Sequence, residues 1–240
     1  MSKERLAMTF VSLVVSCAAV AAADAATDEA VKRQIAFSCS IEDNPSLETS
    51  AFDRAFGMTG RDRVRFGRIL AEMAEARDGS LSGLLINRMG FYGSAEQLPF
   101  LYSRTTNAVY GVEAARAILR IEGVTSNSIA GVESFLSMTN APMPSREDLC
   151  LELLSRRTGA GDLMRRDAED CAYRFFAADD VYDGWYDGRV RALLPGYEHS
   201  KRRLAVLRSV QALGLNRYNE TFITNAIREL VAYPEADLPD

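Results

Sequence analysis

The sequence predicts an all-α protein, an α-α superhelix in which antiparallel helical hairpins stack on one another. From about residue 59 onward, apolar residues recur at spacings of three and four, which is the period of a helix with one buried face. Almost no window shows the strict alternation of a half-buried strand. Short clusters of Gly, Asn, Asp and Pro separate the helical windows, so we expect short connections and antiparallel neighbours.

The N-terminal residues have the three parts of a secretory signal. Lys3 and Arg5 precede an uncharged stretch from Leu6 to Ala23, and small residues suit cleavage after residue 23 or 25. We therefore expect residues 1–23 to be a signal peptide. The chain would then be exported, either to a periplasm or out of the cell.

Two alternatives to a cleaved signal stay open. The uncharged stretch has 18 residues, the lower end of what a membrane-spanning helix needs, but alanine fills its second half and no basic cluster follows. Residues Val14 to Cys17 resemble a bacterial lipobox, with departures at its first and third positions. Lipidation of Cys17 would place the chain on a membrane, and we expect a membrane partner only in that case.

Length and charge restrict the class of protein. Without residues 1–23 the chain has 217 residues, with 26 basic and 32 acidic side chains and a formal net charge of −6. This length supports a sizeable core, and the mildly acidic balance argues against general nucleic-acid binding. We expect an irregular N-terminal segment at residues 24–58 and a helical-repeat domain at residues 59–240.

Capping residues and helix breakers predict the individual helices. Ser94 and Gln97 form a capping box, while Thr59 and either Ser126 or Asn127 suit the N-caps of two other helices. Glycines close several of the helices. The expected helices span residues 26–35, 51–56, 60–77, 81–89, 94–105, 110–121, 128–138, 145–157, 162–178, 187–194, 198–213 and 219–232.

Two successive segments are similar at an offset of 32 to 35 residues. Each contains an apolar-x-Arg-apolar run followed by glycine, at Ile86–Gly90 and Ile118–Gly123, and each ends in a Phe-Leu pair. The glycine turn, polar cap and proline of Arg88–Leu101, with the small alanines of Val112–Ile118, resemble a HEAT-like repeat. The resemblance covers about residues 84–138, and it implies an α-α superhelix with a concave binding face but no particular ligand.

Three cysteines remain after residue 23. In an oxidising compartment we expect Cys150 and Cys171, which lie 21 residues apart on consecutive helices, to form a disulfide that leaves Cys39 unpaired or buried. The alternative is that all three are small core residues. With one histidine and no CxxC motif, we expect no metal site and no cofactor.

The segment at residues 179–188 has the most unusual composition, with four acids, two glycines and three aromatic residues. As a ligand loop it would bind sugars or peptides by ring stacking and hydroxyl groups by its carboxylates. The candidate binding residues are Tyr182, Asp183, Trp185, Tyr186 and Asp187. The alternative, which we favour, is a connecting loop whose rings pack into the core. Its acids do not match an EF-hand.

No pattern identifies a catalytic centre. His199, the one histidine, lies at a polar helix start and no GxSxG motif accompanies it. The spacing of the carboxylates selects no pair among Glu96, Glu113, Glu122, Glu133, Glu147, Asp148 and Glu152. We therefore expect an exported, non-enzymatic helical-repeat protein that binds a protein or peptide through its concave face. The alternative is a secreted α-helical glycan or cell-wall hydrolase with two carboxylates about 5–10 Å apart.

Overall fold

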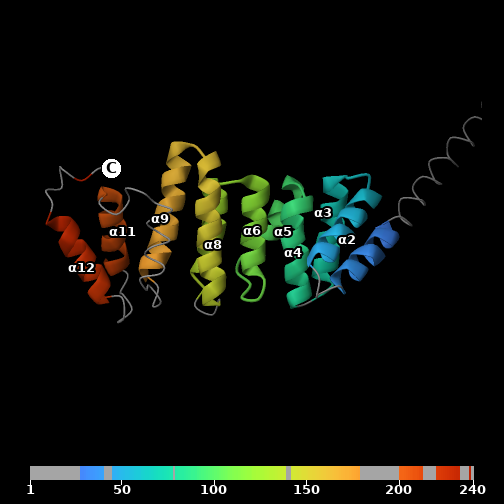
Figure 1. Ribbon diagram of the computed structural model, residues 1–240, viewed down its shortest axis with the longest axis horizontal. Coiled ribbons are helices and arrows are strands. Elements are labelled where there is room, and N and C mark those ends of the chain that lie inside the picture. The colour runs from blue at the N-terminus through green and yellow to red at the C-terminus, as the bar shows by residue number, and fades with distance from the viewer. Residues whose placement is uncertain are drawn as a thin grey trace, which may run out of the picture. The chain divides into compact units, whose positions relative to one another are not determined.

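The fold is all-α, as the sequence predicts (Figure 1). The computed structural model describes residues 28–40, 45–77, 79–138, 142–178, 200–212, 220–232 and 238, and these ranges contain helices and turns but no strand. The chain divides into two compact units, an N-terminal unit (Met1–Gln97) and a C-terminal unit (Leu98–Asp240). None of the helices in the described ranges combines the length and the low polarity that a membrane-crossing helix needs.

The N-terminal unit is helical from the first described residue. Residues 28–39 form a helix, and they are followed by α2 (Pro45–Met58), α3 (Arg63–Glu75), α4 (Ser80–Tyr92) and the 3₁₀ turn η1 (Ala95–Gln97). The segment that we expected to be irregular therefore contains one helix over residues 28–39 and a second that is longer than residues 51–56. It helps to form the core, because Phe52 and Phe56 of α2 contact the aromatic rings of α3 and α4.

Aromatic side chains form the centre of this N-terminal core. The ring of Phe56 lies 5.3 Å from that of Phe66 on α3 and 5.3 Å from that of Tyr92 on α4, centroid to centroid. Phe66 and Tyr92 meet edge to face at 5.7 Å. Such tilted and edge-to-face pairs are the favoured geometries of aromatic rings, so they fix the α3–α4 hairpin on α2.

Helix α3 begins later than expected and has a different cap. Gly60 and Arg61 have left-handed backbone angles, with φ of 69° and 62°, so the chain turns after Thr59 instead of starting a helix there. Asp62 is the N-cap, and its Oδ1 accepts hydrogen bonds from the amides of Val64 (2.9 Å) and Arg65 (3.1 Å). The cap predicted at Thr59 is wrong, because the Thr59 hydroxyl donates back to the carbonyl of Phe56.

The capping box at Ser94 and Gln97 is present, but the helix after it is short. The Gln97 carboxamide oxygen accepts from the Ser94 amide at 2.7 Å, and a Cβ on Gly67 would fall on this carboxamide. Glycine at position 67 thus lets η1 approach α3 closely. Helix α5 (Leu98–Tyr102) then ends three residues before the predicted limit of residue 105.

The C-terminal unit is built from packed helical hairpins. It contains α5, α6 (Gly111–Glu122), α7 (Ser126–Leu136), α8 (Met143–Arg156), the turn η2 (Arg157–Gly159), α9 (Asp162–Ala178), α11 (Lys201–Ala212) and α12 (Glu220–Val231). Helices α6 and α7 pack as one hairpin and α8 and α9 as the next. Between these hairpins α6 contacts α8 and α7 contacts α9, and α9 also contacts α11.

The predicted disulfide is not formed. Cys150 and Cys171 are buried thiols, as is Cys39. Cys150 packs in a cluster with Tyr173 and the apolar residues of α11 and α12, whereas Cys171 packs in a second cluster with residues of α6 and α7. The two side chains therefore belong to different parts of the core. They fit the alternative stated above, in which the cysteines are small core residues.

Candidate functional site

The sequence-predicted binding loop lies outside the described residues. Tyr182, Asp183, Trp185, Tyr186 and Asp187 all fall in the range 179–199, as does His199. In the part of the chain that the structure describes, no three metal-ligating side chains gather as a metal site would require.

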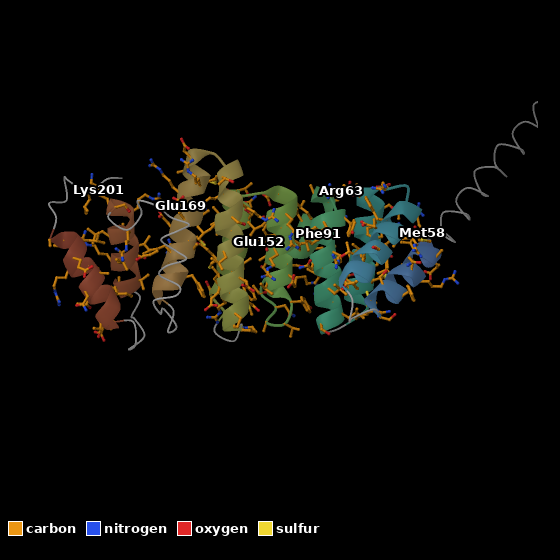
Figure 2. All side chains as sticks on the ribbon, viewed as in Figure 1. Met58, Arg63, Phe91, Glu152, Glu169 and Lys201 are labelled. Atoms are coloured by element: carbon orange, nitrogen blue, oxygen red, sulfur yellow. The ribbon has the colours of Figure 1, made fainter. Side chains whose placement is uncertain are left out.

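The carboxylates singled out from the sequence are mostly joined to arginines. Glu152 of α8 lies 3.3 Å from Nε of Arg116 and 3.2 Å from Nε of Arg120, both on α6, and Arg156 joins it at 3.1 Å (Figure 2). Burial lowers the pKa of the Arg120 guanidinium, and the charge of Glu152 opposes that shift. These groups link two helices, as structural ion pairs do.

Three more carboxylates of that set also form ion pairs with arginines. Glu113 pairs with Arg116 at 3.2 Å, Asp148 with the same arginine at 3.5 Å, and Glu133 of α7 with Arg174 of α9 at 3.1 Å. Glu96 is exposed on η1. None of these acids lines the hollow of the described residues that follows below.

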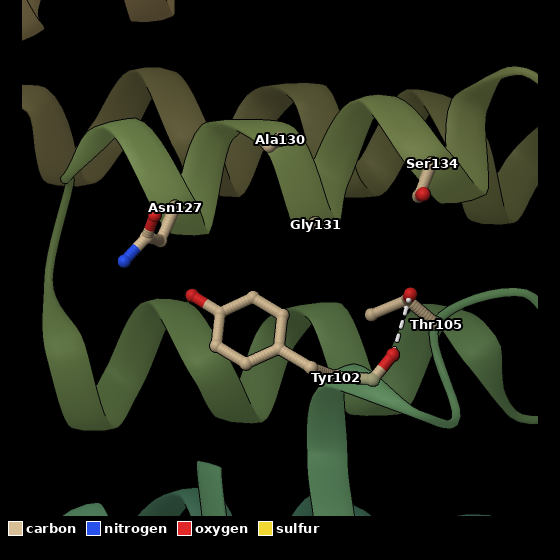
Figure 3. Close-up of a pocket in the computed structure, with 6 residues that line it drawn as sticks. All are labelled: Tyr102, Thr105, Asn127, Ala130, Gly131 and Ser134. Carbon is tan, nitrogen blue, oxygen red and sulfur yellow. Dashed lines mark hydrogen bonds between the residues drawn. The ribbon is translucent and has the colours of Figure 1, made fainter. Parts of the chain in front are cut away.

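An open hollow of about 420 Å³ lies between the end of α5 and one face of α7 (Figure 3). Its lining carries no formal charge and contains hydroxyl groups, one carboxamide and one aromatic ring. The lining residues are Tyr102, Thr105, Asn127, Ala130, Gly131 and Ser134. The Tyr102 ring lies across the hollow beneath α7, with its hydroxyl group directed toward the end where Asn127 lies (Figure 3).

The hollow results from the unequal lengths of the two helices. Helix α5 ends at Tyr102, and the chain turns there because the Thr105 hydroxyl donates to the Tyr102 carbonyl at 3.0 Å. Helix α7 continues for 11 residues and has little side-chain volume on this face. A Cβ on Gly131 would lie 3.1 Å from Cε1 of Tyr102, so glycine is what lets the ring pack against α7.

A hydrogen-bonded group of three residues fixes the floor of the hollow. The Tyr102 hydroxyl donates to Oε2 of Glu122 at 2.5 Å, and the Thr125 hydroxyl donates to Oε1 of the same carboxylate at 2.8 Å. Burial raises the pKa of Tyr102 well above its usual range, and the hydrogen bond to Glu122 raises it further. At neutral pH the hydroxyl thus keeps its proton and holds the ring in place.

Residue types and openness determine what this hollow can hold. Exposed Asn127 and Ser134 supply donors and acceptors that match the N–H and C=O groups of a polypeptide backbone, and Tyr102 supplies an apolar ring face. The tyrosine proton is already engaged by Glu122, and the lining contributes no cysteine, histidine or carboxylate. The arrangement favours binding of an uncharged segment by hydrogen bonds and ring contact.

The sequence contained a signal for this face that our predictions did not use. Asn127, Ala130, Gly131 and Ser134 are spaced i, i+3, i+4 and i+7, so they form one stripe of small uncharged residues on α7. A stripe of small residues can equally pack against a neighbouring helix. Only the early end of α5 leaves this one open to solvent.

Comparisons with known proteins give no relative for this chain. No protein-family model, no curated protein and no solved structure matches it.

Proposed function

We propose that this is an exported, non-enzymatic helical-repeat protein that binds a polypeptide segment of a partner in the hollow between α5 and α7. The observation that carries the proposal is the open, uncharged hollow of about 420 Å³, whose volume falls within the roughly 300–1,000 Å³ typical of binding sites. The signal-like composition of residues 1–23 supports the exported location in this proposal.

The dimensions of the hollow favour a polypeptide over a compact small molecule. Asn127 and Ser134 are seven residues apart on α7, which corresponds to about 10 Å along a helix. An extended chain covers that length with about three residues. Because the hollow opens to solvent along a helix, its occupant can continue beyond both ends, as a segment of a larger protein would.

The stacked hairpins support a recognition role. The α6–α7 hairpin packs on the α8–α9 hairpin so that the two first helices, α6 and α8, are in contact and the two second helices, α7 and α9, are in contact. Stacked hairpins of repeat proteins pack in this way. Repeat proteins commonly use the helices of one layer as a binding surface. In this unit the residues that line the hollow come from α7 and from the end of α5 and the turn after it, and α7 also packs against α9.

A peptide library panned against the chain from Asp24 onward tests the proposal. We expect selected peptides to be low in charge, and Ala130→Arg to weaken their binding about tenfold or more, because an arginine side chain would enter the hollow and cover its donors. Ala130 is exposed, so the substitution leaves the core unchanged. Affinity is measured by titration with labelled peptides.

Ala205→Arg is the matched control. Ala205 is also an exposed alanine inside a helix of the same unit, α11, so it adds the same charge at a distant surface. Equal affinity of the selected peptides for the Ala130→Arg protein and the control protein would show that they do not bind in the hollow. Circular dichroism melting of both proteins shows that they are equally folded.

A further inference from the structure

One carboxylate beside the hollow is held by hydroxyl groups and not by an arginine. Glu122, the last residue of α6, accepts from the Tyr102 hydroxyl at 2.5 Å and from the Thr125 hydroxyl at 2.8 Å. It forms no ion pair with any described residue, whereas Glu133 and Glu152 each pair with an arginine. The part of the chain that the structure describes thus places no positive side chain against the Glu122 charge.

The two helix ends at Glu122 have opposing electrostatic effects. Glu122 ends α6, where the helix dipole places partial negative charge, so a carboxylate is unfavourable there. Thr125 caps α7, whose start places partial positive charge near the same carboxylate. Because the two effects are similar in size and opposite in sign, the charge of Glu122 remains available to a ligand.

The carboxylate fixes the direction of the hydrogen bond from Tyr102. An ionised carboxylate can only accept, so the phenolic proton of Tyr102 points at Glu122 and lone pairs of the phenolic oxygen remain. No described group donates to that oxygen. The hydroxyl group lies toward the end of the hollow where Asn127 is found (Figure 3). That end therefore presents an oxygen that accepts a hydrogen bond from a ligand and cannot donate one.

Asn127 adds a second acceptor at the same end of the hollow. Its side chain is exposed and makes no hydrogen bond to any described residue. Rotation of the carboxamide lets either its oxygen or its nitrogen face a ligand. Two oxygens beside an anionic group suit a compact cation that carries several donors, and a primary ammonium group has these properties.

The shape of the hollow favours a lysine side chain as the source of the ammonium group. The aliphatic stem of a lysine can lie along the Tyr102 ring, which crosses the hollow (Figure 3). Both oxygens of Glu122 already accept one hydroxyl group, which favours the single contact of an ammonium over the paired contacts of a guanidinium. A chain N-terminus has no such stem to cover the ring.

We propose that the polypeptide segment bound in the hollow places a lysine ammonium group at the Asn127 end, where the Tyr102 oxygen accepts from it and the Glu122 charge attracts it. This inference rests on the proposed function, because it names the side chain by which that site recognises its partner. The rest of the segment is uncharged, as suits the uncharged lining. Glu122 is then a specificity-determining residue, although it does not itself line the hollow.

Peptides selected on the chain from Asp24 onward test the inference. We expect lysine to be enriched at one position relative to the starting library. Selected peptides are then synthesised with an acetylated N-terminus and with this lysine kept, replaced by norleucine or replaced by Nε-acetyl-lysine. Either replacement should weaken binding about tenfold or more, because it removes the charge from the hydrogen-bonded group.

Glu122→Gln separates recognition of the charge from a structural role. The glutamine oxygen can still accept from a hydroxyl group, but the affinity for the lysine peptide should fall to about that for the norleucine peptide. Tyr102→Phe keeps the ring and should lower the same affinity ratio, because the accepting oxygen is lost. Glu220→Gln is the matched control, since it removes the same charge from an exposed side chain of α12 in the same unit. A purely structural defect would weaken both peptides alike and leave their ratio unchanged.

The outcomes distinguish this inference from the proposed function. Absence of lysine enrichment, equal binding of the lysine and norleucine peptides, or an unchanged ratio in the Glu122→Gln protein would each overturn the lysine inference. The proposed function would stand in those cases if Ala130→Arg still weakens binding. Equal binding to the Ala130→Arg protein and its control, or a library that yields no binders, would overturn both. Binding that requires a free N-terminal amine in place of lysine would overturn the inference in favour of a chain N-terminus.

Discussion

Two tyrosine hydroxyl groups, one in each compact unit, donate to carboxylates. Tyr92 donates to Asp53 at 2.7 Å, and Tyr102 donates to Glu122 at 2.5 Å. Burial and the nearby negative charge raise the pKa of Tyr92 to about 12, and the same causes raise the pKa of Tyr102. Both hydroxyl groups of the folded protein therefore remain protonated donors at neutral pH.

These raised pKa values predict that stability falls at alkaline pH. In the unfolded chain a tyrosine loses its proton near pH 10, so above about pH 10 the unfolded state binds fewer protons than the folded state, and the free energy of unfolding decreases until the folded pKa is passed. Burial also raises the pKa of Cys39 to about 11 and that of Cys171 to about 12, so the decrease begins near pH 9.

Tyr92→Phe should make this decrease shallower above about pH 10, while the part due to the thiols stays. At neutral pH the same substitution should cost about 1–2 kcal/mol, because Asp53 loses a donor. Urea denaturation at a series of pH values measures both effects. Parallel stability curves for the two proteins would show that Tyr92 does not titrate differently on folding.

The three buried thiols also predict how the protein responds to reductant. Because Cys150 and Cys171 lie in different core clusters, we expect oxidised and reduced samples of the chain from Asp24 onward to melt at the same temperature. Intact mass before and after reduction checks that no disulfide has formed. A lower melting temperature with reductant, together with the mass change of one disulfide, would contradict the structure.

At the scale of elements, glycine decides how closely helices approach. Gly111 begins α6, and a Cβ there would lie 2.5 Å from the carbonyl oxygen of Thr105 and 2.9 Å from the ring of Phe135 on α7. Backbone and a fully buried ring can move little, so the contact between the α5–α6 turn and α7 depends on this glycine.

Gly111→Ala should therefore destabilise the protein by about 1–3 kcal/mol through overpacking. Gly57→Ala is the control, because Gly57 is exposed near the end of α2 and a Cβ there meets nothing within 4 Å. We expect that second substitution to be neutral or to stabilise by about 0.5–1 kcal/mol. Equal effects of the two substitutions in urea denaturation would rule out the steric explanation.

Helix periodicity predicted the elements better than their ends. Residues 162–178 form α9 as expected, because an acidic start and an unbroken period of apolar residues define them. The start of α3 was placed too early, since nothing in the sequence shows that Arg61 adopts a left-handed angle and leaves the cap to Asp62. Likewise α7 is capped by Thr125, one residue before the first of the two predicted caps, Ser126 and Asn127, with Ser128 completing its capping box.

At the scale of the molecule, arginine–carboxylate pairs join different helices in both units. In the N-terminal unit Arg88 of α4 pairs with Glu48 of α2 at 2.5 Å, and in the C-terminal unit Arg202 of α11 pairs with Glu169 of α9 at 3.0 Å. Glu152 is the most connected of these acids, because it serves Arg116, Arg120 and Arg156 together.

Removing the Glu152 charge should loosen the contact between α6 and α8. Glu152→Gln removes a carboxylate that Arg116, Arg120 and Arg156 share, at a site where the Glu152 side chain is only 16% exposed, so we expect a loss of about 1–3 kcal/mol that added salt reduces. Asp162→Asn is the control, because that side chain is 84% exposed and its pair with Arg165 should contribute less than about 1 kcal/mol. Thermal melts at low and high salt distinguish the two effects.

The hollow could be predicted from the sequence only in part. The stripe from Asn127 to Ser134 can be read from the period of α7, but its exposure depends on α5 ending at Tyr102 and on the turn that Thr105 stabilises. The disulfide prediction failed for a related reason. Periodicity indicates that Cys150 and Cys171 are buried, but it does not say which neighbouring helices each one faces.

The buried thiols make the protein suitable for selective chemical labelling. A maleimide reacts with an accessible thiolate, and the thiols of the described residues are inaccessible, with the pKa of Cys39 near 11 and that of Cys171 near 12. In the chain from Asp24 onward, a cysteine introduced at exposed Phe91 or Val109 would therefore be modified at neutral pH without first replacing the three buried cysteines.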